Sequence, residues 1–82
     1  AIAMAMFGFL GGKSETWKSD FDTLVRTYSY AKKGDLIVVE TDLSEMQAQR
    51  KAEECCYKLN GLSISQKEDL GGMFRYTFHK DR

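Results

Sequence analysis

The chain has 82 residues, 43% of them hydrophobic and 29% charged, and twelve basic residues balance twelve acidic ones. This composition is typical of a single folded domain over residues 1–82 with a modest core, and it leaves no room for a second domain. A net charge of zero argues against nucleic acid as the partner, because binding to phosphates depends mainly on lysine and arginine.

The opening residues, AIAMAMFGFL, are apolar but too short to span a bilayer, and they lack the charged start of a secretory signal. We therefore expect no transmembrane segment and a first strand over residues 2–10. Because Met4 and Met6 are candidate start residues, residues 1–5 could be foreign to the natural chain. The stretch GFLGGKS resembles a phosphate-binding loop but is one residue short, so we interpret it as a strand-to-helix turn.

Residues 14–33 carry apolar side chains at helical spacing. These are Trp17, Phe21, Leu24, Val25, Tyr28 and Ala31. The pattern predicts a first helix over this range, ended by Lys32, Lys33 and Gly34. The aromatic side chains of this helix are expected in the core.

The run Leu36 to Val39 predicts a central strand covered on both sides or nearly so. Ser44 and Gln47 then have the spacing of a capping box, and Asn60-Gly61 ends the second helix. Its inward stripe is expected to be Ala48, Ala52, Cys55 and Leu59.

Two alternating segments complete the chain and predict a hairpin. Leu62, Ile64 and Gln66 alternate with polar residues, as do Phe74, Tyr76 and Phe78. Since both strands keep a polar side, we expect both helices on one face of the sheet. The predicted fold class is α+β, a two-layer α/β sandwich of order β-α-β-α-β-β with a mixed four-stranded sheet and a parallel first β-α-β unit.

Few residues suggest chemistry. The adjacent Cys55 and Cys56 are the only cysteines and form no disulfide framework, which indicates a reducing, cytoplasmic setting. Helical geometry predicts that Cys55 is buried and that Cys56, at the edge of the stripe, is the thiol candidate. His79 has no carboxylate at a spacing that would orient it, and one histidine with two adjacent cysteines cannot build a metal site. We expect no metal and no cofactor.

Over nearly its whole length the chain resembles the TusA/SirA-like family of small sulfur carriers. KKGDLIVVETD is similar to that family's turn into the second strand, CCYKLNGLSI to its second helix and link, and FRYTFHK to its closing strand. The resemblance implies a role in sulfur relay, in which a cysteine in a Cys-Pro-X-Pro motif at the start of the first helix carries a persulfide. Here Trp17-Lys18-Ser19-Asp20 occupies that position, with neither the cysteine nor the prolines.

The first hypothesis is therefore a degenerate sulfur-carrier-like domain, of uncertain catalytic status, that acts by protein–protein interaction through Trp17, Lys18, Arg75 and His79. The alternative is a nucleic-acid-binding module, because Alba-like proteins and the C-terminal domain of translation initiation factor 3 share the element order. That module would use Lys67, Arg75, His79 and Lys80 on the open sheet face. The partner protein, any sulfur cargo and the oligomeric state are left open by the sequence.

Overall fold

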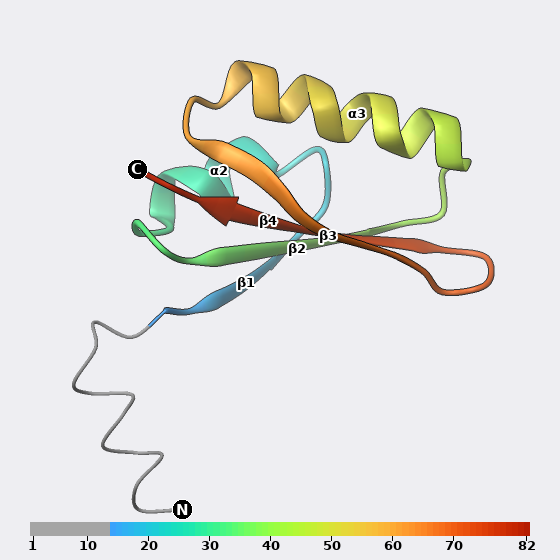
Figure 1. Cartoon of the computed structure of the whole chain (residues 1–82), viewed down its shortest axis with the longest axis horizontal. Helices are drawn as coiled ribbons and strands as arrows, with labels where there is room; N and C mark the ends of the chain where they lie inside the picture. The colour runs from blue at the N-terminus through green and yellow to red at the C-terminus, as the bar shows by residue number, and fades with distance from the viewer. Residues whose placement is uncertain (1–13) are drawn as a thin grey trace, which may run out of the picture.

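The computed structural model describes residues 14–82, and the elements in that part follow the predicted order β-α-β-α-β-β (Figure 1). They are β1 (Thr16–Ser19), α2 (Leu24–Tyr30), β2 (Leu36–Thr41), α3 (Glu45–Lys58), β3 (Leu62–Asp69) and β4 (Phe74–Lys80). The expected strand over residues 2–10 and most of the GFLGGKS segment lie outside the described residues.

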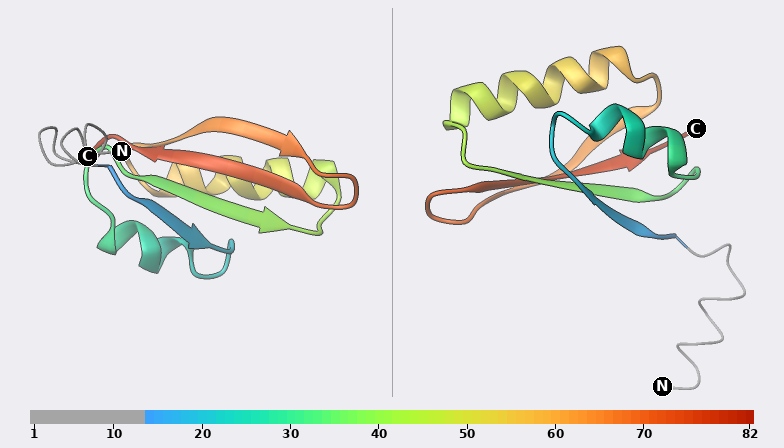
Figure 2. Two further views of the ribbon diagram at one scale, coloured as in Figure 1. Left: turned by 90° about the horizontal axis from the view of Figure 1, so that it is seen from below. Right: turned by 180° about the vertical axis from the view of Figure 1, so that it is seen from behind.

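The sheet has the strand order β1-β2-β4-β3. β1 runs parallel to β2, whereas β4 is antiparallel to both of its neighbours. Both helices cover the same face, as the two turned views show (Figure 2). No helix or strand of residues 14–82 covers the opposite face, which is called the open face below. The predicted fold class, a mixed four-stranded sheet with two helices on one side, is confirmed.

The predicted helix over residues 14–33 was wrong in its first half. Thr16–Ser19 form the edge strand β1, and the helix extends only from Leu24 to Tyr30. The apolar spacing from Trp17 to Leu24 was helical, but Thr-Trp-Lys-Ser also alternates with the period of a strand. As a strand, this short segment forms backbone hydrogen bonds with Leu36–Val39 of β2, whereas a single isolated helical turn would be unstable.

The core lies between the helices and the covered face of the sheet. β4 contributes the large side chains Tyr76 and Phe78, which are fully buried, and β2 contributes Ile37 and Val39. The central position predicted for β2 is confirmed, although its other side, Leu36 and Val38, is only half-buried. This difference arises because neither α2 nor α3 covers the open face.

α3 begins and ends where the sequence predicts, with Ser44 as its N-cap, but the reciprocal bond of a capping box, from the Ser44 amide to the Gln47 side chain, is absent from the hydrogen bonds of residues 14–82. The Ser44 hydroxyl accepts a hydrogen bond from the Gln47 amide at 3.3 Å and lies 3.3 Å from the Gln47 side-chain oxygen. After the helix, Gly61 has φ of +93°, a conformation that glycine adopts without the steric cost of a side chain. Neither helix in residues 14–82 has the length and apolarity needed to cross a membrane.

A β-bulge interrupts β3 and reverses its alternation. The register with β4 shifts between Ile64 and Gln66, so Ser65 is an extra residue. Beyond it Gln66 pairs with Thr77 and Lys67 with Tyr76, which places Lys67 on the covered side of the sheet. The single alternating pattern predicted for this strand is therefore wrong after Ile64.

Candidate functional site

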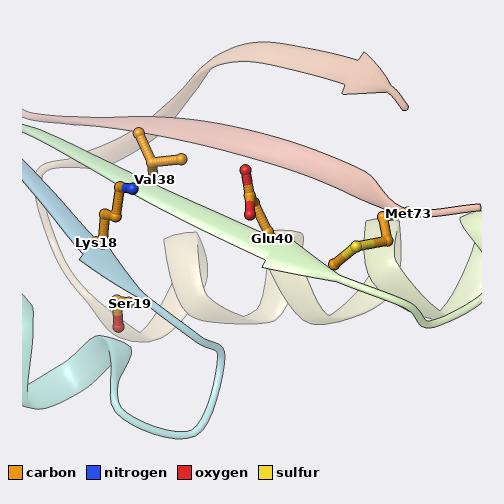
Figure 3. A pocket seen from close by; sticks show the side chains of 5 residues that line it. All are labelled: Lys18, Ser19, Val38, Glu40 and Met73. Carbon is orange, nitrogen blue, oxygen red and sulfur yellow. The ribbon is translucent and has the colours of Figure 1, made fainter. Parts of the chain in front are cut away.

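The open face of the sheet contains a cavity of about 250 Å³ near the end of β1. It is lined by Lys18, Ser19, Val38, Glu40 and Met73 (Figure 3). Strand pairing explains the grouping, because Lys18 lies opposite Val38 on β2, and Glu40 lies two residues further along the same side. The cavity thus combines an apolar floor with one ammonium and one carboxylate group.

Trp17, a predicted binding residue, faces the covered side of the sheet. Its indole Nε1 donates a hydrogen bond to Asp35 at 2.9 Å, and its ring packs against the core. Asp35 also accepts from the backbone amides of Lys32 at 2.8 Å and Glu15 at 3.0 Å. These bonds, led by the one from Lys32, lower the pKa of Asp35. Trp17 therefore has a structural role: it ties β1 to the turn before β2.

Arg75 lies on the open face, where two carboxylates neutralise it. Its guanidinium contacts Glu40 at 2.9 Å and Glu68 at 3.4 Å across the neighbouring strands. The hydrogen bond to Glu40 is the main cause of a raised Arg75 pKa. Arg75 consequently offers little net charge to an anionic ligand.

His79 shares the open face and lies 2.7 Å from Asp81 through Nδ1. The expectation that no carboxylate is placed to orient this histidine was wrong, because the chain brings Asp81 back beside it just after β4. Among residues 14–82 no third ionisable side chain forms a hydrogen bond or ion pair with them, and the pair links the end of β4 to the segment that follows.

The turn between β1 and α2, where the sequence resemblance would place a nucleophile, contains a network of hydroxyl groups. Ser19 Oγ lies 2.9 Å from Thr23 Oγ1 and accepts from Thr27 Oγ1 at 3.1 Å. Asp20 accepts from the Thr23 amide at 2.8 Å and from the Thr23 hydroxyl at 2.9 Å. The hydrogen bond from the Thr23 backbone amide is the main cause of the lowered pKa of Asp20. With no histidine or thiol in it, the network closes the turn into α2 and holds no activated nucleophile.

The two cysteines are both half-buried on α3 and pack against the core. The predicted contrast, with Cys55 buried and Cys56 the more accessible thiol, is not seen, because Cys56 follows the fully buried Ala52 by one helical turn. Burial is the main cause of a raised pKa for both thiols; Glu54 adds to it at Cys55, and Cys55 and Glu53 add to it at Cys56. These surroundings oppose thiolate formation and therefore slow thiol chemistry.

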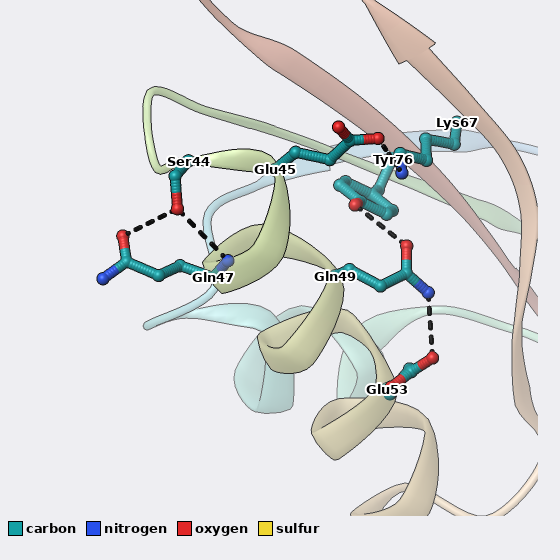
Figure 4. A network of polar contacts seen from close by, with 7 residues as sticks. All are labelled: Ser44, Glu45, Gln47, Gln49, Glu53, Lys67 and Tyr76. Atoms are coloured by element: carbon teal, nitrogen blue, oxygen red, sulfur yellow. Dashed lines mark hydrogen bonds and ion pairs between the residues drawn. The ribbon is translucent and has the colours of Figure 1, made fainter.

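Two of the basic residues assigned to the nucleic-acid alternative are absent from the open face. Lys67 reaches across the covered side to Glu45 at 3.0 Å, at the start of α3 (Figure 4). Lys80 is buried and donates to the carbonyls of Tyr28 in α2 and of Ala31, the C-cap residue of that helix. The bulge in β3 displaces Lys67, and the pairing of Lys80 with Leu62 directs Lys80 toward the helices.

The same side of the sheet contains a polar link to α3. The Tyr76 hydroxyl lies 3.1 Å from the Gln49 side-chain oxygen, and the Gln49 amide nitrogen donates to Glu53 at 3.0 Å (Figure 4). Through this link the buried phenol has a hydrogen-bond partner, and the helix is fixed over β4.

A second cavity, of about 240 Å³, lies where β1 and β2 end. It is mainly acidic, with Asp20, Asp22, Glu40 and Asp42 opposed by Lys51. Within residues 14–82 no three His, Cys, Asp or Glu side chains are grouped to hold a metal ion. The acidic residues are therefore explained as the solvated ends of the parallel strands.

Sequence reasoning missed four of the five residues that line the open-face cavity, namely Ser19, Val38, Glu40 and Met73. Val38 and Glu40 had a usable signal, since both alternate with the buried side of β2. Met73 follows a glycine turn and had none. Lys18, Arg75 and His79 share the open face, whereas Trp17 and the cysteines lie on the covered side.

Comparisons of the chain with protein-family models, with curated proteins and with solved structures found no match.

Proposed function

We propose that this domain docks to a partner protein through its open sheet face and the end of β1, and that it serves sulfur relay as a carrier-like domain without a catalytic thiol. The observation that carries this proposal is that the candidate docking surface and the two cysteine thiols lie on opposite sides of the sheet. The cavity beside Lys18 opens on one side of the sheet, whereas Cys55 and Cys56 belong to a helix that covers the other side.

The charges support a protein partner over nucleic acid. On the open face Arg75 is paired with Glu40 and Glu68, and Lys67 and Lys80 are engaged with the helices. A phosphate backbone needs several cations on one surface, and this face has about as many carboxylates as cations. A surface with both charges and an apolar cavity suits a polypeptide.

The raised thiol pKa values support a role without covalent chemistry. A persulfide carrier needs a thiolate in an accessible, electropositive environment. Cys56 instead has Glu53 and Cys55 nearby and is partly covered by the core. We therefore assign Cys56 to packing, in place of sulfur transfer.

The test compares sulfur loading with binding. The full chain is incubated with a persulfide-donor enzyme, and intact mass is measured with a genuine sulfur carrier as the positive control. We expect no stable one-sulfur adduct. In a parallel assay we expect the wild-type chain to bind that donor enzyme. The affinity should be unchanged in Cys56→Ser and weakened in Lys18→Glu. A stable adduct on Cys56, or loss of binding in Cys56→Ser alone, would refute the proposal.

A further inference from the structure

At the outer edge of β1, the backbone N–H and C=O groups of alternate residues point away from β2. The Leu36 amide donates to the Glu15 carbonyl at 2.9 Å, and Thr16 pairs with Leu36. In a parallel ladder alternate residues direct both backbone groups to the same neighbour, so Glu15 and Trp17 face β2. Thr16 and Lys18 therefore direct their N–H and C=O groups outward, and no hydrogen bond to them is formed within residues 14–82.

The two edges of the sheet differ in how they resist further pairing. β3 has the bulge at Ser65 and, beyond it, the charged residues Lys67 and Glu68. Bulges and charges of this kind discourage strand addition. The pairing of β1 with β2 is regular over its whole length, and Lys18 is its only charged residue. β1 is the edge better suited to accept another strand.

The cavity lies where a side chain of an added strand would arrive. Lys18 is on the open face, and the cavity extends from it past the end of β1 toward Glu40 and Met73. The Lys18 ammonium has no ion-pair partner in the described part of the chain, whereas Glu40 is paired with Arg75. A carboxylate facing Lys18 would supply the missing charge.

We propose, on the basis of the docking function above, that an extended segment of the partner protein adds to β1 as an antiparallel strand. Its recognition pattern is an apolar residue followed two positions later by an acidic residue. The acidic residue lies opposite Lys18, and the apolar one, on the same face beyond Ser19, fills the cavity between Val38 and Met73. Backbone bonds to Thr16 and Lys18 provide affinity, and the cavity and the ammonium provide specificity.

A second copy of the chain fits this edge less well. Antiparallel pairing of β1 with itself, centred on Trp17, puts the two Lys18 side chains at diagonal positions on the same face, roughly 7–8 Å apart. It also places Ser14 of the second copy where the cavity calls for an apolar side chain. The charge and the cavity both favour a different polypeptide.

The experiment uses the full chain and a fluorescein-labelled peptide, Gly-Thr-Leu-Thr-Glu-Thr-Val-Gly, in which leucine is the apolar residue and glutamate the acidic one. Anisotropy is expected to show saturable binding that Lys18→Glu weakens about tenfold or more. A peptide with lysine in place of glutamate should regain affinity for the Lys18→Glu protein.

A proline at Thr16 tests the backbone contribution. The Thr16 amide faces away from β2, so Thr16→Pro removes an outward donor and leaves the ladder with β2 intact. We expect Thr16→Pro to lose binding and Thr16→Val, which keeps the amide, to retain it. Circular dichroism confirms that both variants are folded.

Three results would overturn the strand addition: equal binding by Thr16→Pro and Thr16→Val, no rescue by the charge-swapped peptide, or Thr16 and Lys18 amides already protected from hydrogen exchange without peptide. The last result would mean that the edge is occupied by another segment of the chain or by a second copy. If the persulfide-donor enzyme still binds in any of these cases, the docking function stands and only the mode of recognition is wrong.

Discussion

Replacement of Lys80 by methionine should destabilise the domain strongly, although the change retains much of the side-chain volume. Lys80 is 8% exposed, and its ammonium donates to the carbonyls of Tyr28 at 2.6 Å and Ala31 at 2.7 Å. It also lies 4.2 Å from the centre of the Tyr28 ring. The carbonyls at the end of a helix lack partners within the helix, so this lysine caps α2 from β4.

The magnitude follows from the contacts that methionine cannot make. A hydrogen bond to a charged group contributes about 1.5–3 kcal/mol, so two such bonds contribute roughly 3–6 kcal/mol. Methionine avoids the cost of burying a charge, and water can reach part of the exposed helix end, which together offset some of the loss. We expect the free energy of unfolding to fall by about 2–4 kcal/mol, a large share of the roughly 5–15 kcal/mol of a typical domain.

Urea unfolding followed by circular dichroism measures this change. The matched control is Lys58→Met, because Lys58 is largely exposed and its one ion-pair partner within residues 14–82 is Glu54 on the same helix. That variant should differ from wild type by no more than about 0.5 kcal/mol. If Lys80→Met also stayed within about 0.5 kcal/mol of wild type, the carbonyls of α2 would be satisfied by solvent, and the capping argument would fail.

Ser44→Ala should lower stability by about 1 kcal/mol in the same assay, because it removes the cap of α3; an unchanged urea midpoint would contradict that role. The lowered pKa of Asp35 means that its contribution to stability is present above its unfolded pKa of roughly 4 and is lost as the pH falls through the lower folded value. Asp35→Asn should therefore show a smaller fall in urea midpoint between about pH 5 and pH 2 than the wild type shows, and equal falls would refute the linkage. Short DNA or RNA should bind the full chain no more tightly than about 10⁻⁴ to 10⁻⁶ M at physiological salt, and a nanomolar constant with steep salt dependence would favour the nucleic-acid alternative.

The sequence predicted an element correctly where its apolar pattern and its end signals indicated the same structure. The capping spacing of Ser44 and Gln47, the β-branched run at Leu36 and the alternation at Tyr76 each located an element that the structure contains. The first helix failed because Trp17 has helical spacing to Leu24 but is held by a distant carboxylate, Asp35. That hydrogen bond is a tertiary contact, which the local periodicity of apolar residues cannot predict.

The candidate site was less predictable than the fold. Arg75 and His79 could be placed on the open face because alternation assigns each residue of a regular strand to one side. Lys18 could not, because residues 14–33 were predicted to be a helix and Lys18 lies on the edge strand β1. Lys67 could not, since the bulge at Ser65 leaves no mark in the pattern of apolar residues. The pairing that neutralises Arg75 depends on strand neighbours brought together by the sheet order, which the sequence leaves open.

The capping of α2 by Lys80 also determines when the helix can form. Lys80 and Ala31 are 49 residues apart along the chain, and α2 has only seven residues, too few to be stable alone in water. A chain emerging from the ribosome would expose the residues of α2 and β2 well before β4 appears. The first half would then lack both its central antiparallel neighbour and the ammonium that holds its helix. We expect folding to be a late, concerted event with a rate set by closure of this long loop, slower than in helical domains of similar size.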